Sequence, residues 1–274
     1  MMCTKTQLII KRMERLDKEL VSRNLIDSRS KAQELIKNNK VLVNGKVCNK
    51  SSVLIGGKDE IVIEANDFFK YVSRGGFKLE KALDVFACDV TGKTIMDIGS
   101  STGGFTDCCL QRGAKHMICI DVGSDVMHPS LRNDPRIDLY ENTNFKDVDD
   151  KLFIGVDMAV IDVSFISIEK IFKKISQQDI KIDIVSLIKP QFECGREIAS
   201  KYSGVIVNKS IHKDLLRDLL AKLSTLGFEC LGLDYSPIKG GDGNIEYLGY
   251  FSNYQGQGKS LDIENIVETA FSLV

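Results

Sequence analysis

The sequence predicts an α/β protein with a mixed, seven-stranded sheet and a small α+β unit in front of it. Three observations support this fold class. Short apolar runs typical of buried strands alternate with helical stretches, which favours a parallel sheet covered by helices on both faces. A glycine-rich turn follows the first of these runs. The last two expected strands, residues 228–235 and 246–251, are separated by a loop too short for a crossover helix, so they form an antiparallel pair.

The strands and helices of the body follow one another in the order that an open α/β sheet requires. We expect helices at residues 103–112, 168–176 and 208–226. Besides the terminal pair, we expect strands at residues 94–99, 116–122, 137–141, 158–163 and 182–188.

The first part of the chain predicts two helices followed by a small sheet. Apolar residues recur at helical spacing over residues 13–25, and Asp27 or Ser28 can cap a second helix. The Asn44-Gly45 pair supplies the two positive φ angles of a type I′ hairpin turn. The runs at residues 53–55 and 61–63 complete this sheet.

Charge is distributed unevenly along the chain. We expect an N-terminal domain of residues 1–64, a linker of residues 65–73 and a C-terminal domain of residues 74–274. Residues 1–50 carry 12 Lys and Arg against 5 Asp and Glu, a net charge of +7, whereas the remaining residues carry 25 against 33, a net charge of −8. A basic head on an acidic body indicates a polyanion-binding module, although a solvated helical face would have a similar composition.

Composition excludes several classes of protein. No apolar run approaches the roughly 18 residues of a membrane span, and the first 20 residues lack the apolar centre of a signal peptide, so we expect a cytoplasmic protein without a membrane partner. The eight cysteines have no metal-ligand spacing and there are only three histidines. We therefore expect reduced thiols and no metal site.

The glycine-rich turn predicts a cofactor site, because glycine lets backbone approach a ligand closely. A dinucleotide site reads G-x-G-x-x-G, whereas this turn reads G-x-x-x-G-G, which suits S-adenosylmethionine, a cofactor without a phosphate. An acidic residue ends the next strand and can accept the ribose hydroxyls. A glycine-rich turn without a ligand is the alternative. The candidate cofactor-binding residues are Asp97, Gly99, Ser100, Ser101, Thr102, Gly103, Gly104 and Asp121.

Four charged side chains stand where expected strands begin or end, namely Lys78, Asp162, Lys189 and Glu246. Open α/β sheets bind ligands beyond the carboxyl ends of their strands. Asp162 and Lys189 follow apolar runs that end adjacent strands, so we expect the two charges to compensate each other. A structural ion pair is the alternative to a catalytic one.

The N-terminal segment resembles the S4-type RNA-binding domain. The matching motifs occur in the family's order: Arg15-Leu-Asp, Leu20-Val, Ser28-Arg-Ser-Lys-Ala, Leu35-Ile, Val41-Leu-Val-Asn-Gly-Lys-Val and Ile61-Val-Ile. The resemblance implies that two cationic helices face the phosphates of folded RNA, where shape and backbone contacts dominate recognition. The candidate RNA-binding residues are Arg15, Arg29, Lys31 and Lys37.

Together the four charged side chains resemble the Lys-Asp-Lys-Glu tetrad of FtsJ-like ribose 2′-O-methyltransferases. With the S4-type head in front, the pattern is similar to that of the TlyA family, whose members are often labelled hemolysins. Further motifs of that family are Tyr71-Val-Ser-Arg-Gly-Gly-Phe-Lys-Leu, Leu131-Arg-Asn-Asp-Pro-Arg and Leu187-Ile-Lys-Pro-Gln-Phe-Glu. Residues 124–129 depart from the family's usual Gly-Tyr-Gly-Gln-Leu run, which bears on the cofactor pocket and on target choice.

The resemblance implies a Rossmann-like, S-adenosylmethionine-dependent methyltransferase that modifies a cytidine ribose of 16S rRNA, 23S rRNA or both, in ribosomal subunits. The ribose hydroxyl must lose its proton as it attacks the methyl group. We expect Lys189 to be the general base, because burial and the charge of Lys78 favour its neutral form, and Asp162 to orient it. Glu246 is expected to fix Lys78 or the ribose. No metal is needed.

Other functions fit the sequence less well. A pore-forming role requires an extended amphipathic segment, and the apolar runs here are short and strand-like. An NAD-dependent oxidoreductase would carry G-x-G-x-x-G. A non-catalytic RNA-binding or ribosome-assembly protein stays open as the alternative, although the complete tetrad argues against it. Monomer and dimer are both compatible with the sequence.

Overall fold

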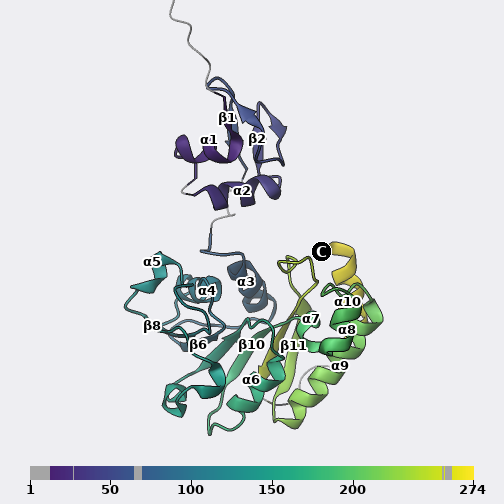
Figure 1. Ribbon diagram of the computed structural model, residues 1–274. Helices are drawn as coiled ribbons and strands as arrows, with labels where there is room; N and C mark the ends of the chain where they lie inside the picture. The colour runs from purple at the N-terminus through teal and green to yellow at the C-terminus, as the bar shows by residue number, and fades with distance from the viewer. Residues whose placement is uncertain (1–12, 27, 65–69, 255, 257–260) are drawn as a thin grey trace, which may run out of the picture. The chain divides into compact units, whose positions relative to one another are not determined.

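The computed structural model describes residues 13–26, 28–64, 70–254, 256 and 261–274. The chain divides into two compact units, Met1–Lys70 and Tyr71–Val274, which we call the head and the body (Figure 1). Within the described residues, no helix combines the length and the apolar character that crossing a membrane requires.

Two short helices of the head pack on each other and on small sheets. The helices bury Leu16, Leu20, Leu35 and Ile36, which form the core of this unit. Asn44 and Gly45 have φ angles of 50° and 74°, which confirms the predicted hairpin turn. The elements are β1 (Glu14–Arg15), α1 (Leu16–Ser22), α2 (Arg29–Lys37), β2 (Val41–Val43), β3 (Lys46–Val47), β4 (Leu54–Ile55) and β5 (Ile61–Ile63).

Two expectations for the head were wrong. The first helix does not begin near residue 13, because residues 14–15 pair with residues 54–55 as an antiparallel β1–β4 ladder. The head therefore has two sheets, β1-β4 and β3-β2-β5, where one was expected. Ser28 caps α2 by accepting a hydrogen bond from the backbone N–H of Lys31 at 3.3 Å, and the alternative cap, Asp27, lies outside the described residues.

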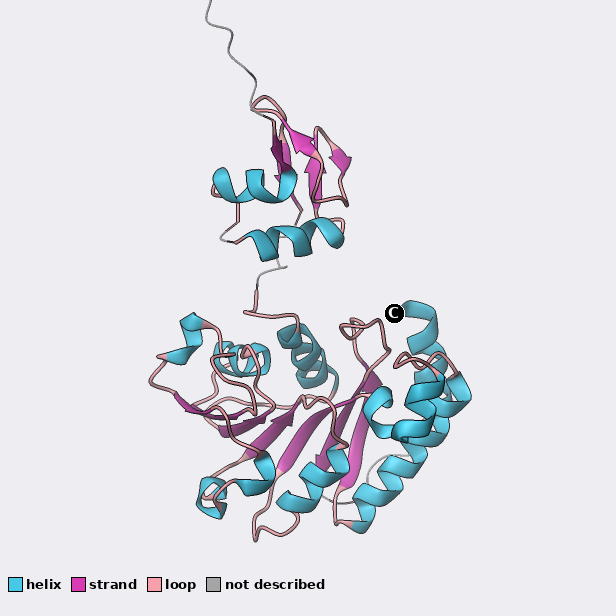
Figure 2. Cartoon of the chain, in the orientation of Figure 1, coloured by secondary structure: helices cyan, strands magenta, loops and turns pink. Residues whose placement is uncertain are grey.

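The body is built on the predicted seven-stranded mixed sheet, in the order β11-β12-β10-β9-β6-β7-β8 (Figure 2). Strands β8, β7, β6, β9 and β10 run parallel, and β12 is antiparallel to both β10 and β11. The strands are β6 (Thr94–Ile98), β7 (His116–Ile120), β8 (Ile137–Tyr140), β9 (Met158–Ile161), β10 (Asp183–Ile188), β11 (Glu229–Tyr235) and β12 (Tyr247–Ser252).

The sheet separates two apolar cores, because successive side chains of a strand point to opposite faces. Along β6, Ile95 packs with α3 and α4, whereas Met96 and Ile98 pack with α6 and α9. The expected helices are α4 (Gly104–Gln111), α6 (Ile168–Ile175) and α9 (Lys209–Thr225). Helices that were not predicted are α3 (Gly75–Val85), α5 (Pro129–Arg132), α7 (Pro190–Glu193), α8 (Gly195–Lys201) and α10 (Ile263–Leu273), with short 3-10 turns at Phe145–Asp147 and Asp150–Phe153.

Candidate active site

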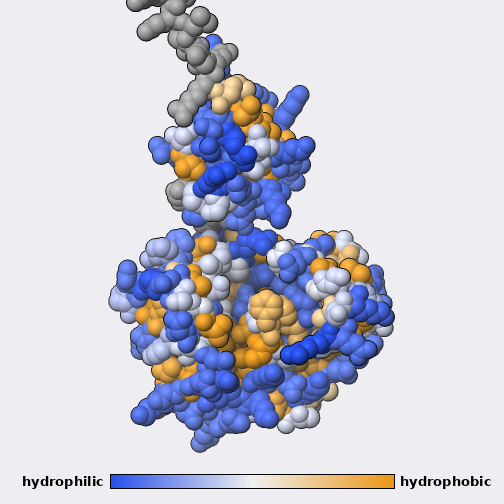
Figure 3. Space-filling view, viewed as in Figure 1, coloured by the Kyte–Doolittle hydropathy of each residue, from blue (hydrophilic) through white to orange (hydrophobic). Residues whose placement is uncertain are grey.

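The order of the strands reverses between β6 and β9, and this switch point places the ends of several strands together. The chain leaves β6 toward β7 and β8 on one side and returns to β9 and β10 on the other. Loops that diverge in this way leave a crevice beyond the carboxyl ends of the strands. The body is hollowed there, and apolar side chains gather in the hollow between the part that carries α4 and α5 and the part that carries α7 and α8 (Figure 3).

The four predicted catalytic side chains form two ion pairs in this crevice. Lys78 Nζ lies 2.6 Å from Glu246 Oε2, and Lys189 Nζ lies 2.6 Å from Asp162 Oδ1. Lys78 and Asp162 line one cavity of about 220 Å³, so the two pairs face the same space. The expected compensation between Asp162 and Lys189 is therefore confirmed, and it arises because β9 and β10 are neighbours.

Lys189 has a second polar partner that sequence reasoning missed. Its Nζ donates to Ser164 Oγ at 3.0 Å, and the ring of Phe192 lies 5.9 Å away. Ser164 belongs to the loop between β9 and α6. Glu193 holds this loop, accepting from Ser167 Oγ at 2.6 Å and from the backbone N–H of Ile168 at 2.8 Å. Burial raises the pKa of Glu193.

Glu246 is placed by a buried histidine and by a close glycine. His212 Nε2 donates to the carbonyl of Ile206 at 2.9 Å, which leaves Nδ1 to accept from the hydroxyl of Tyr247 at 2.7 Å. Burial lowers the pKa of His212, so this neutral tautomer is favoured. A side chain at Gly240 would collide with the Glu246 carboxylate. Glu246, which directly precedes β12, is thereby fixed from two sides, through its neighbour Tyr247 and by the space beside Gly240.

The glycine turn lies between two adjoining cavities. The cavity of about 220 Å³ is lined by Gly99, Ser100, Ser101, Thr102 and Gly104. A second cavity, of about 420 Å³, is lined by Gly99, Ser101 and Asp121. The two cavities share Gly99, Ser101 and Asp162, and together they offer an elongated ligand one continuous surface.

Two of the predicted cofactor-binding residues line neither cavity. Asp97 is fully buried beneath the turn, where its Oδ2 accepts from Thr106 Oγ1 at 2.6 Å. Gly103 packs against the side chains of Met127 and Leu131, and its Cβ would lie 2.5 Å from each. Gly103 is thus required for packing of the turn, and its contact with a ligand stays a prediction.

The buried carboxyl of Asp97 is electrostatically unusual. Burial, together with the charge of Asp162, raises its pKa to about 7, against the opposing effect of the Thr106 hydrogen bond. Its Oδ1 and the hydroxyl of Ser100 are buried and have no hydrogen-bond partner among the described residues. Buried polar atoms are nearly always paired, so these two indicate that a ligand completes the site.

Sequence reasoning missed cavity residues from several further segments, including residues 163–166 after β9. Ser73, Arg74 and Phe105 line the smaller cavity, and Thr143, Asn144 and Phe145 line the larger one. The last three follow β8, the edge strand on this side of the switch point. Their position after a predicted strand was the available signal, but no charge or glycine drew attention to it.

Residues 124–129 form a loop outside the lining of both cavities. The backbone N–H groups of Asp125, Val126 and Met127 donate to the carboxylate of Glu141 at 2.9–3.1 Å. These backbone bonds, with a further bond from Arg132, lower the pKa of Glu141 to about 2. The departure from the family pattern therefore bears on the support of Gly103 through Met127, from a segment that does not line the two cavities.

In the head, two of the four predicted RNA-binding residues share one buried partner. Asp17 has no exposed surface and accepts from Arg15 Nε at 2.9 Å, from Arg29 Nε at 2.8 Å and from Gln33 Nε2 at 2.7 Å. The arginine side chains are 37% and 51% exposed. Lys31 and Lys37 extend from the same helix as Arg29. Asp17 itself was not predicted as a functional residue, although it stands in the motif Arg15-Leu-Asp.

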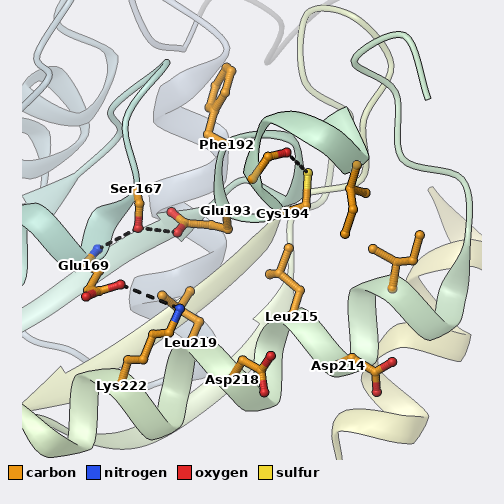
Figure 4. A pocket seen from close by; sticks show the side chains of 13 residues that line it. Ser167, Glu169, Phe192, Glu193, Cys194, Asp214, Leu215, Asp218, Leu219 and Lys222 are labelled. Carbon is orange, nitrogen blue, oxygen red and sulfur yellow. Dashed lines mark hydrogen bonds and ion pairs between the residues drawn. The ribbon is translucent and has the colours of Figure 1, made fainter. Parts of the chain in front are cut away.

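A further groove of the body, of about 550 Å³, holds none of the predicted catalytic side chains. It lies between the α7–α8 segment and α9, with Leu215 and Leu219 at its floor and Asp214, Asp218 and Glu169 at its rim (Figure 4). Phe192 also lines this groove, and Glu193 points to Ser167 (Figure 4). Lys222 also lines this groove and pairs with Glu169 at 3.8 Å, which leaves Asp214 and Asp218 to repel phosphates, so the groove is a poor candidate for an RNA site. The described residues contain no cluster of three or more metal-ligating side chains.

A glycine turn at the switch point of a mixed seven-stranded sheet, beside paired lysines and carboxylates, defines a class I methyltransferase. The FtsJ-like methyltransferase family matches residues 71–252, and the S4 domain matches residues 14–61. Hemolysin A of Brachyspira hyodysenteriae is 44% identical, over 86% of this chain and 99% of that protein. The 16S/23S rRNA (cytidine-2′-O)-methyltransferase TlyA of Mycobacterium tuberculosis is 36% identical, over 86% of this chain and 89% of that protein.

A solved structure described as a hemolysin from Streptococcus thermophilus is 36% identical, covers 95% of this chain and 96% of that one, and superposes with a TM-score of 0.74. The chain therefore belongs to the FtsJ-like methyltransferase family, in its TlyA branch, which carries an S4 domain.

Proposed function

We propose that this protein is an S-adenosylmethionine-dependent 2′-O-methyltransferase that acts on a cytidine of rRNA in ribosomal subunits. The observation that carries the proposal is the pair of ion pairs, Lys78–Glu246 and Lys189–Asp162, beside the cavities at the glycine turn. A site for methyl transfer to a hydroxyl needs a cofactor pocket and proton-accepting groups at its mouth, and both occur here. The names of the relatives support rRNA as the substrate.

The residues around the glycine turn fit S-adenosylmethionine. The unpaired Asp97 Oδ1 and Ser100 hydroxyl suit the amino acid end of the cofactor, which offers both donors and acceptors. Asp121 lines the larger, more apolar cavity, where Phe145 and Ile171 would contact a flat base. When bound, the cofactor supplies an electrophilic methyl group and its own leaving group.

Proton removal falls to Lys189 in this proposal. The lysine must be neutral when the ribose hydroxyl attacks, and the ammonium that it then becomes is stabilised by Asp162 at 2.6 Å. Ser164 holds the same nitrogen in position. Glu246 keeps Lys78 beside the cavity, where the ammonium group of Lys78 can bind an RNA phosphate or the ribose.

The head supports RNA as the partner. Asp17 orders two guanidinium groups side by side, and the bonds to it use two N–H donors of Arg15 and one of Arg29 out of the five that each group carries. The remaining donors of Arg15 and Arg29 can bind phosphate oxygens. Removing residues 1–70 should therefore weaken RNA binding and leave cofactor binding to the body intact.

The decisive experiment incubates the protein with methyl-labelled S-adenosylmethionine and unmodified ribosomal subunits, small and large separately. A methylated 2′-oxygen protects the adjacent phosphodiester from alkali, so label should be recovered in an alkali-resistant dinucleotide that begins with cytidine. Label on a base, or no label in either subunit, would contradict the proposal.

A second candidate is a non-catalytic RNA-binding or ribosome-assembly protein, which the S4 domain by itself would support. Such a protein would bind subunits equally well with and without S-adenosylmethionine and would transfer no methyl group. The same incubation, followed by sedimentation of the subunits, separates the two candidates.

A further inference from the structure

A third depression, of about 520 Å³, lies on the body next to the proposed reaction centre. We call it the side groove. Phe165 and Ile166 line both the side groove and the larger cofactor cavity, so the two are adjacent. Phe192, another wall of the side groove, lies 5.9 Å from Lys189 Nζ. Any chain that leaves the reaction centre in this direction enters the side groove.

The side groove has the chemistry of a nucleic-acid strand site. It combines two exposed cations, Lys170 and Arg196, with the aromatic side chains of Phe165 and Phe192, whose ring centroids are 5.0 Å apart. Cations that follow a phosphate backbone, interleaved with flat rings, are the usual composition of single-strand grooves. The only acidic lining residue among those described is Asp242, so the side groove is positive although the body is acidic.

Lys170 and Arg196 differ from most cations of the body. Lys174, Lys213 and Arg132, for example, are held in ion pairs by carboxylates. Among the described residues, no side-chain hydrogen bond or ion pair involves Lys170 or Arg196; the backbone N–H of Lys170 donates to the carbonyl of Ser167. Two unneutralised cations on α6 and α8 thus face one depression, where an anion would pair with both.

An unsatisfied polar atom also lies in the side groove. The side-chain oxygen of Gln191 is buried and has no hydrogen-bond partner among the described residues. Such an acceptor is costly to leave unpaired, and a ribose hydroxyl or a base amino group would satisfy it. The wall is also preformed, because Glu193 ties the loop before α6 to α7.

We propose that the side groove binds the RNA strand on one side of the target nucleotide, with Lys170 and Arg196 contacting its phosphates and Gln191 accepting from a ribose or base. This inference rests on the proposed function, because the side groove would bind the RNA whose target nucleotide lies at the proposed reaction centre. The groove with the acidic rim on the other side of Phe192 offers no such path.

The test compares two double variants of the full chain. Lys170→Ala with Arg196→Ala removes both cations of the side groove. The control, Lys173→Ala with Lys201→Ala, removes one exposed cation from each of the same helices, α6 and α8, outside the side groove. Methyl transfer to unmodified subunits, S-adenosylmethionine affinity and the salt dependence of binding to a short single-stranded RNA are measured for each.

The groove variant should raise KM for subunits about 10-fold or more, with cofactor affinity within about 2-fold of wild type. The negative slope of log affinity against log salt concentration should become shallower by about 1.4, the change expected when two phosphate contacts to a single strand are lost. The variant with Lys170→Arg and Arg196→Lys should restore both values. A groove variant that behaves like the control would overturn the inference. RNA binding is measured without methyl transfer, so failure of this inference can be told apart from failure of the proposed function. A wild-type protein that transfers no methyl group would contradict the proposed function alone.

Discussion

Gly99 and Asp162 meet where β6 and β9 end: a Cβ on Gly99 would lie 2.6 Å from the carbonyl oxygen of Asp162. The turn that lines both cofactor cavities therefore rests directly on the residue that pairs with Lys189. Any displacement of this turn changes the distance between the cofactor site and the proposed base.

Gly99→Ala should impair both cofactor binding and catalysis. Gly99 has a φ of 84°, and the added methyl group would collide with backbone that cannot rotate away. We expect a loss of about 1–3 kcal/mol of stability and at least a 10-fold weaker S-adenosylmethionine affinity. Gly155→Ala is the matched control, since Gly155 has a φ of 77° and no atom within 4 Å of its Cβ position. Calorimetric titration that shows equal cofactor affinity for both variants would refute this role of Gly99.

Lys189→Ala should lower kcat by about 10²–10⁴-fold, the range expected for loss of a general base. Cofactor affinity should change only a few-fold, because Lys189 lines neither cofactor cavity. Ser164→Ala is a graded companion that removes one hydrogen bond to the same nitrogen and should cost less. Equal losses of kcat and cofactor affinity in Lys189→Ala would show that the residue supports the fold.

The stability of the cofactor-free protein should depend on Asp97. A pKa of about 7 in the folded state, against about 3.9 in the unfolded state, means that the folded protein holds this proton more tightly. The free energy of unfolding contributed by this group should therefore fall by about 1.4 kcal/mol per pH unit as pH rises from about 4 to 7, and then level off. Urea unfolding between pH 5 and 8 should show this decline in the wild type, relative to Asp97→Asn. Parallel pH curves for the two proteins would contradict the assignment.

The substitution Asp17→Asn tests whether RNA affinity depends on how Arg15 and Arg29 are positioned or only on the net charge of the head. The substitution adds one positive charge to the head, which by itself would tighten RNA binding. It also removes the carboxylate that fixes Arg15 and Arg29, and we expect this loss to dominate, with RNA affinity about 5–10-fold lower at moderate salt. Glu19→Gln removes a carboxylate from the same helix that pairs with Arg23, and not with Arg15 or Arg29, and accepts from Ser22, so it serves as the control. Tighter RNA binding by Asp17→Asn at every salt concentration would disprove the positioning role.

The body without residues 1–70 should bind S-adenosylmethionine as the full chain does. The body has its own two cores, and both cofactor cavities are lined by residues 73 and above. RNA affinity and its salt dependence should both fall, because the paired arginines are lost. Fluorescence anisotropy with a labelled rRNA fragment measures this change. An unchanged RNA affinity would show that the body alone engages RNA.

The sheet and the pairing of Asp162 with Lys189 could be predicted because both depend on local pattern. Apolar runs mark the strands, and a charge after each run marks the end that faces a ligand. Neighbouring strands then bring the two charges together. The helix that carries Lys78 was missed, because its Gly75-Gly76 start lowers the intrinsic helix propensity. Only packing of these glycines against Tyr71 and the start of α4 explains why a helix begins there.

The contacts that support the site depend on the folded chain and could not be read from spacing. Glu193 holds the loop before α6, and His212 holds Tyr247 beside Glu246, across 25 and 35 residues of sequence respectively. Gly103 fits the cofactor motif, yet its neighbours are Met127 and Leu131, from a loop and from α5, and sequence alone does not place either of them near the turn. Asp17 was overlooked for a similar reason, since its burial results from the packing of α1 on α2.

Because β12 runs against its neighbour β10, it begins at the edge where the parallel strands end, and Glu246, the residue just before β12, lies there. The connection before β12 is therefore constrained by the reaction centre, because a change in its length would move the Glu246 carboxylate away from Lys78. The connection after β12 starts at the opposite edge of the sheet, remote from the reaction. Insertions or deletions accumulated there over evolution would alter how the C-terminal helix is attached and leave the reaction centre as it is.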